Sequence, residues 1–149
     1  MTTPTLTQLT ARSGLDVLDH LDRYIAIPVT AGMQAQGDLI VIPFDVVADV
    51  VIVHLRARWT TVPQAGIEVL RSGSGGNPHT LIADDDRCEW TTGHHDSEFL
   101  TLGVLDTRTT AYLIHPEHGA SGIAPGRYVI RRQREGGVGT RPGGRFVVD

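Results

Sequence analysis

Short apolar runs separated by glycine and proline are the feature that most constrains the fold of this chain. Runs of this length, bounded by turn residues, are typical of β-strands rather than helices. The segments that fit are Leu39–Ile42, Ile67–Leu70, His79–Ala83, the neighbourhood of Trp90, Phe99–Leu105, Thr109–Ile114 and Tyr128–Gln133. Turn signals lie between them, among them Pro43, the glycine-rich segment 72–78 and Pro125-Gly126. The sequence therefore predicts an all-β fold, a small barrel or sandwich of about seven or eight short strands.

Two regions allow more detailed strand predictions. Apolar and polar residues partly alternate from Val50 to Trp59, which predicts one half-buried strand with Arg56 and Arg58 together on its outer face. The two runs between Phe99 and Ile114 meet near Asp106, and this arrangement predicts a β-hairpin.

The N-terminal region predicts one short amphipathic helix. The segment Ser13–Asp16 resembles a capping box, with Ser13 as the N-cap residue. Leucines then recur every third residue, at Leu15, Leu18 and Leu21. This spacing predicts a helix over about residues 14–24, whose apolar stripe packs on its own domain or contacts a neighbouring subunit. The threonine-rich residues 1–12 are expected to form a loose arm.

Length and charge limit the organisation and the setting of the chain. At 149 residues it most simply forms one domain. We expect an arm and short helix over residues 1–36, and a single β domain over 37–149 with a mobile glycine-rich segment near 136–144. The net charge of −4 gives no global attraction for nucleic acid or anionic membrane.

The expected compartment follows from what the sequence lacks. No apolar run approaches the roughly eighteen residues that span a bilayer, and the first residues do not resemble a signal peptide. All 13 basic residues are arginine, a composition expected of a GC-rich bacterial or phage gene. We therefore expect the cytoplasm of a bacterium or of a phage-infected host, with a virion as an alternative setting.

Cys88 is the only cysteine, so neither an intramolecular disulfide nor a cysteine-based zinc site can form. Asp84, Asp85, Asp86 and Glu89 lie close to it in the sequence. Neighbouring carboxylates raise the pKa of a thiol, so this sequence context predicts an unreactive Cys88.

Three of the seven histidines form the candidate chemical site: His79, His115 and His118. His79 follows the glycine-rich segment, and the other two lie at and just beyond the end of a predicted strand. If these strand ends are neighbours, three imidazoles can converge on one zinc or iron ion, with Glu117 as a further ligand or general base. The alternative interpretation is that they are turn histidines that hydrogen-bond to the backbone.

Arginines crowd the second half of the last long strand. Side chains alternate along Arg127–Glu135, so both faces begin apolar and end polar. We therefore expect Arg131, Arg132 and Arg134 to lie at an exposed edge or in an assembly contact. Arginines in such a row also suit phosphate or nucleic acid, but few aromatic residues lie between them, which disfavours single-strand binding.

Five stretches together resemble a set of short uncharacterised bacterial and phage proteins. They are Gly37–Pro43, Gly76–Leu81, His115–His118, Pro125–Tyr128 and Arg132–Glu135. The set shares a G-D-x-L-x-I-P start, a G-H-x-H motif, an H-x-E-H motif and a P-G-x-Y…R-Q-R-E strand. The resemblance covers about residues 37–135 and implies a common organisation but no particular activity.

This chain departs from the shared pattern at Asn77, where the related proteins often have histidine. The substitution removes one possible metal ligand. Since no complete catalytic motif is present either, we expect a non-enzymatic binding or structural module, of phage or mobile-element origin, that needs no cofactor and acts through self-association or other assembly contacts. The alternatives are a small metal-dependent, hydrolase-like enzyme that uses the histidines, and a nucleic-acid-binding module.

Overall fold

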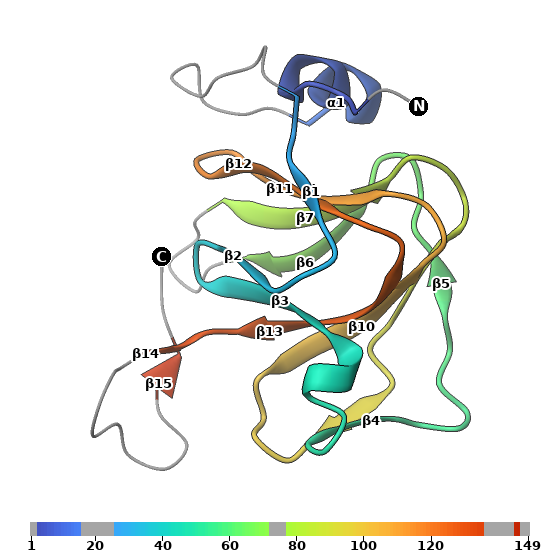
Figure 1. The fold of residues 1–149 in the computed structure, drawn as a ribbon, viewed down its shortest axis with the longest axis vertical. Helices are drawn as coiled ribbons and strands as arrows, with labels where there is room; N and C mark the ends of the chain where they lie inside the picture. The colour runs from blue at the N-terminus through green and yellow to red at the C-terminus, as the bar shows by residue number, and fades with distance from the viewer. Residues whose placement is uncertain (1–2, 16–25, 72–76, 136–144, 147–149) are drawn as a thin grey trace.

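The computed structural model describes residues 3–15, 26–71, 77–135 and 145–146, and it shows a β-sandwich with one short α-helix (Figure 1). The five-stranded sheet has the order β1 (Val29–Thr30), β12 (Gly119–Ile123), β11 (Ala111–His115), β7 (Pro78–Ala83) and β6 (Ile67–Arg71). The six-stranded sheet has the order β2 (Gln34–Gln36), β3 (Leu39–Pro43), β13 (Gly126–Arg132), β10 (Thr101–Thr107), β8 (Cys88–Thr91) and β5 (Thr60–Thr61). Two small pairs are β4 (Val51–Val53) with β9 (His94–Asp96), and β14 (Arg134–Glu135) with β15 (Arg145–Phe146). The helices are α1 (Leu6–Ser13) and the 3-10 helix η1 (Phe44–Val46). The predicted all-β class is confirmed.

The main core lies between the two large sheets. Leu81 and Leu113 of the five-stranded sheet belong to one apolar cluster with Val41, Leu105 and Ile130 of the six-stranded sheet. Because side chains alternate along a strand, the neighbouring positions point away from this core. They are nevertheless buried, since other elements cover both outer faces.

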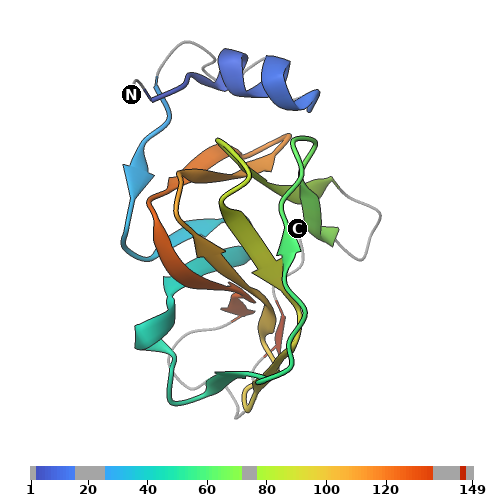
Figure 2. The same ribbon diagram turned by 90° about the vertical axis from the view of Figure 1, so that its right-hand side faces the viewer.

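Helix α1 covers the outer face of the five-stranded sheet. Leu6 and Leu9 pack with Ile82, Tyr112 and Ile114. Figures 1 and 2, which differ by a 90° turn, both place α1 at the end of the molecule opposite β4. The outer face of the six-stranded sheet is covered instead by η1, β4 and the residues between them, through a second apolar cluster. Because α1 covers one face of the five-stranded sheet and the main core covers the other, all five residues of β11 are buried.

The structure has one short N-terminal helix, as predicted, but α1 covers Leu6–Ser13, most of which was expected to be a loose arm. Thr5 and Gln8 form the capping box that starts α1, and Gly14, with φ 77°, ends it. Ser13 is therefore the last residue of a helix rather than the N-cap of the next one. Leu15 packs on the apolar cluster beneath α1, on its own domain. Most of the expected helix, including Leu18 and Leu21, lies outside the described residues, as do residues 136–144.

The predicted strands at Leu39–Ile42, Ile67–Leu70, His79–Ala83, Trp90 and Tyr128 are confirmed as β3, β6, β7, β8 and β13. The long strand from Val50 to Trp59 was wrong, because β4 covers only Val51–Val53. A turn follows, in which the N–H of Ala57 donates to the carbonyl of His54. Arg56 and Arg58 are exposed, but they do not share one face of a strand.

The predicted hairpin of β10 and β11 was also wrong. Strand β10 pairs with β8 and β13, whereas β11 pairs with β7 and β12, so the two strands belong to different sheets. Their connection is braced by a hydrogen bond from the Thr107 hydroxyl to the Thr109 carbonyl and by one from the Arg108 N–H to the Arg87 carbonyl. A short polar connection suits a hairpin or a connection between two sheets, so the local sequence did not distinguish them.

Among the described helices, none is long and apolar enough to span a membrane.

Candidate functional site

The motifs that the sequence suggested converge at one end of the sandwich. The turn between β2 and β3 carries Asp38, the start of β7 carries His79, and the end of β11 carries His115. Gln133, after β13, donates to the carbonyls of Gly37 and Leu39, on either side of Asp38, at 2.9 and 3.0 Å. Residues that are far apart in the sequence thus build one site.

The three candidate histidines lie together, and we call them the histidine cluster. The ring centroids of His79 and His115 are 4.4 Å apart, as are those of His115 and His118, and His79 and His118 are separated by 6.3 Å. His79 and His115 are buried and His118 is exposed. The cluster therefore runs from the interior to the surface.

His79 is held by hydrogen bonds at both ring nitrogens. Nδ1 lies 3.0 Å from Gln36 Oε1, and Nε2 lies 2.9 Å from Asp38 Oδ1. The amide nitrogen of Gln36 donates to the Leu113 carbonyl at 2.7 Å, so Oε1 is the amide atom that faces His79 and must accept. With acceptors on both sides, the ring fits best as an imidazolium paired with the Asp38 carboxylate. Only 1% of His79 is exposed, so both hydrogen bonds are buried.

The hydrogen bonds nearer the surface, at His115 and Glu117, differ from those of His79. His115 Nδ1 accepts from the Glu117 N–H at 3.1 Å, which requires an unprotonated Nδ1 and therefore a neutral ring with its proton on Nε2. The Glu117 carboxylate accepts from the side-chain amide of Asn77 at 3.1 Å. Asn77 therefore orients an exposed carboxylate. His118, Glu117 and Asn77 are the members of the site that solvent can reach.

The geometry does not favour a metal ion held by all three histidines in this arrangement. Within the described parts of the chain, no group of three or more His, Cys, Asp or Glu side chains is arranged to hold one. Ring nitrogens, not ring centroids, bind metals, and both nitrogens of His79 already make hydrogen bonds. A metal would need His79 to release Asp38 or Gln36.

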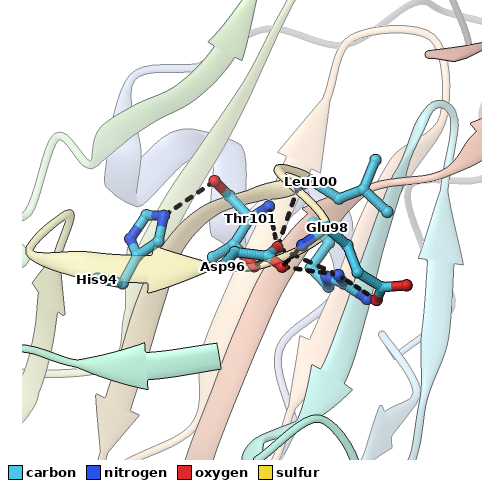
Figure 3. Close-up of polar contacts among 6 residues, drawn as sticks. His94, Asp96, Glu98, Leu100 and Thr101 are labelled. Carbon is cyan, nitrogen blue, oxygen red and sulfur yellow. Dashed lines mark hydrogen bonds and ion pairs between the residues drawn. The ribbon is translucent and has the colours of Figure 1, made fainter. Parts of the chain in front are cut away.

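The sequence predicted Arg131 to lie at an exposed edge, but the structure buries it. Only 7% of the residue is exposed, and its Nη2 donates to Asp96 at 3.1 Å and to Glu98 at 2.9 Å. The two acceptors, Asp96 and Glu98, are labelled in Figure 3. Arg131 shares the outer face of β13 with Val129. Val129 packs against Val47 and Val51, whereas Asp96 at the end of β9 and Glu98 in the turn after it cover Arg131. Arg132 is half-buried at the end of β13, and the side chain of Arg134 is not among the described parts.

Asp96 is the centre of a hydrogen-bond network that the sequence did not reveal. Its carboxylate accepts from the N–H groups of Glu98, Leu100 and Thr101, from the Thr101 hydroxyl and from Arg131. Burial opposes ionisation of this carboxyl, but hydrogen bonds from Thr101, from the Glu98 N–H and from Arg131 outweigh it and hold the pKa of Asp96 well below its usual range. The available signal was an aspartate followed by a polar turn, where such side chains often accept from the backbone.

The turn that Asp96 organises places Phe99 in solvent. Phe99 has φ 58°, a left-handed conformation, and is 76% exposed. Its ring contacts His95 on β9, edge to face, with centroids 6.5 Å apart. His95 pairs across the strands with Ile52, which is 60% exposed, and Leu55, just after β4, is fully exposed. We call Ile52, Leu55, His95 and Phe99 the β4–β9 surface.

Burial, with smaller contributions from Asp106, Glu89 and Asp85, raises the pKa of the Cys88 thiol to about 11, in the direction that the sequence predicted.

A cleft of about 480 Å³ lies at the far end of β7 from His79. Asp84 in that cleft accepts from Arg12 and Tyr112, each at 3.0 Å.

The fold and the site define an all-β sandwich domain with a buried histidine cluster at one end. A family model described as a domain of unknown function, DUF8820, matches residues 35–133, and the chain belongs to this family. The match runs from β2 to Gln133 and includes the histidine cluster, the Asp96 network and the β4–β9 surface. Neither the curated proteins nor the solved structures contain a match to this chain.

Proposed function

We propose that this domain is a non-enzymatic binding module that acts through protein–protein contacts at the β4–β9 surface. The observation that carries the proposal is Phe99, a large aromatic side chain held in solvent in a left-handed conformation. Such a backbone costs an L-residue other than glycine roughly 1–2 kcal/mol. Strain of this kind persists where surrounding interactions impose it, and it is often associated with function.

The Asp96 network is the surrounding interaction that imposes the conformation. The N–H groups on both sides of Phe99, from Glu98 and Leu100, donate to the Asp96 side chain, and the Phe99 N–H donates to the Asp96 carbonyl. The loop is therefore ordered before any partner arrives, which lowers the entropic cost of binding. Exposed aromatic residues on rigid elements are typical of the residues that dominate binding energy.

The inner part of the histidine cluster supports this non-enzymatic interpretation. His79, Asp38 and Gln36 satisfy one another and the Leu113 carbonyl inside the protein. They are placed to join the β2–β3 turn to the five-stranded sheet, which is a structural role. We propose the cytoplasm of a bacterium or of a phage-infected host, or a virion, as the setting of the contacts.

Site-specific photo-crosslinking tests the proposal. A benzoylphenylalanine replacing Phe99 should give a covalent adduct with another chain in cells that express the full protein. The same group replacing Met33, an apolar residue that is 59% exposed in the turn before β2, should not. Equal yields at the two positions, or no adduct at position 99, would count against the proposal.

A metal-dependent, hydrolase-like enzyme is the second candidate, and the 4.4 Å separations within the histidine cluster favour it. One zinc or iron ion would then bind His115 and His118, with His79 turning from its present partners and Glu117 as the general base. Elemental analysis of protein purified without a histidine tag decides between the two functions. Metal at one equivalent, lost in the His118→Ala variant, would establish the enzyme as the better candidate.

Nucleic-acid binding has less support than either. Arg131 is buried in an ion pair with Asp96, and Arg127 pairs with Asp106 at 2.9 Å. Binding through the remaining arginines would weaken steeply with salt, because phosphate contacts release counterions. A salt titration with labelled DNA and RNA measures this directly.

A further inference from the structure

We infer that the partner on the β4–β9 surface is a second copy of this chain, related by a twofold axis near Ile52. The inference rests on the proposed function, since it names the partner for the same surface. Two observations carry it: the order of charges on either side of β4, and the unpaired edges of the β4–β9 pair.

The charges around β4 are arranged for self-recognition. Exposed acidic residues, Asp45 and Asp49, precede the strand, and exposed basic residues, Arg56 and Arg58, follow it. A twofold axis through the middle of an antiparallel contact places the first segment of one copy against the second segment of the other. Each acidic segment then faces a basic one, and this occurs twice in the dimer.

The centre of the same contact is apolar. Ile52 is the middle residue of β4 and, along the chain, lies midway between the acidic and basic segments. Leu55 follows it by three residues, and Phe99 contacts His95, the cross-strand partner of Ile52, so the twofold axis would bring two copies of each apolar side chain into one buried patch. An apolar centre with a charged rim is the usual composition of a specific interface.

The strand edges are available for such a contact. Among the described strands, β4 and β9 pair only with each other, so each has an edge that is not hydrogen-bonded to a third strand. Unpaired edges readily accept a strand from another chain. A heterologous partner could use the apolar patch, but it would not require opposite charges placed symmetrically about Ile52.

Sedimentation velocity of the full chain over a range of concentrations tests the inference. The wild type should shift from one copy to two, that is from 16.1 kDa to twice that mass, as concentration rises. Phe99→Asn should weaken dimerisation by about tenfold or more, because an aromatic residue at the centre of an interface is a typical hot spot. Asparagine tolerates a positive φ, so the variant should fold. Met33→Asn, at an exposed position away from β4, is the matched control and should dimerise as the wild type does.

Charge exchange distinguishes a second copy from another protein. Asp49→Arg alone and Arg56→Asp alone should each weaken the dimer, whereas the variant with both changes should regain it. Rescue of this kind is expected only if the two residues face each other across a self-contact.

Each outcome bears on the inference in one direction. A wild type that stays monomeric at every concentration overturns it, as does a dimer that Phe99→Asn leaves intact or that the double charge exchange fails to restore. If crosslinking at position 99 instead captures a different chain, this inference fails and the proposed binding function stands. If no chain is captured and no dimer forms, both fail.

Discussion

Replacing Asp96 by asparagine should destabilise the protein by about 3 kcal/mol, because it breaks a buried ion pair while preserving side-chain shape. Arg131 is 7% exposed, and its Nε is buried without a partner among the described residues. Its guanidinium therefore depends on contacts made by Nη2, to Asp96 and to the half-exposed Glu98. Removing one partner of such a pair leaves an uncompensated charge, which typically costs about 3–5 kcal/mol.

Two features adjust this estimate in opposite directions. Glu98 remains beside Arg131 and offsets part of the lost attraction, which favours the lower end of the range. The asparagine amide, however, brings N–H donors into a site where Glu98, Leu100 and Thr101 already donate. We therefore retain about 3 kcal/mol, a large part of the roughly 5–15 kcal/mol by which domains are usually stable.

The chain provides a matched control in Asp106→Asn. Asp106 pairs with Arg127 at 2.9 Å, but both side chains are nearly half exposed, and exposed pairs contribute only about 0–1 kcal/mol. The same chemical change at the two positions thus separates the effect of burial from the loss of an aspartate.

Urea unfolding at neutral pH, followed by the fluorescence of Trp59 and Trp90, measures both free energies. Asp96→Asn should lower the midpoint strongly at an unchanged slope, and Asp106→Asn should lower it slightly. A loss below about 1 kcal/mol for Asp96→Asn, or equal losses for the two variants, would refute the reasoning that the buried network holds this turn in place.

Three further predictions concern acid, packing and the histidine cluster. Folding lowers the pKa of Asp96, so the stabilisation from this carboxylate is complete above its unfolded pKa near 4 and is lost as pH falls. Below that pH, urea titrations should show the free energy of unfolding of the wild type falling by up to about 1.4 kcal/mol per pH unit more than that of Asp96→Asn. Gly103→Ala should destabilise the protein by roughly 1–3 kcal/mol and alter Trp90 fluorescence, because the added Cβ would overlap the Trp90 ring; an unchanged spectrum and midpoint would contradict this. His79→Ala should cost about 3–5 kcal/mol by leaving its buried carboxylate partner unpaired, whereas the exposed His118→Ala should cost under about 1 kcal/mol; similar losses would argue against a structural role for His79.

Several strands could be predicted because their residues carry the signal locally. In β3, β7 and β13 an apolar run is bounded by turn residues, and the period of two reflects backbone geometry alone. The start of α1 was also readable, since Thr5 and Gln8 have the spacing of a capping box. The prediction followed the more prominent leucine spacing after Ser13 instead, in a segment that lies mostly outside the described residues.

The candidate site was predictable in its members but not in its hydrogen bonds. His79, His115 and His118 were identified from spacing, and they do lie together. Their neighbours Gln36 and Asp38 were not identified, because a polar residue in a short turn has no local mark that it will meet a buried histidine. The contacts of His79 to both residues, rather than the spacing of the histidines, decide which ring nitrogens remain for chemistry.

The sequence by itself determined the β class and the alternation along each strand, because these depend on residues within a few positions of one another. Only the tertiary structure decided which sheet each strand joins, since β10 and β11 are neighbours in the chain and lie in opposite layers. It also decided that Arg131 is buried and Phe99 exposed, the reverse of what their chemistry suggests. The physical reason is that burial depends on what covers a side chain, and Arg131 is covered by Asp96 and Glu98, more than thirty residues earlier in the chain.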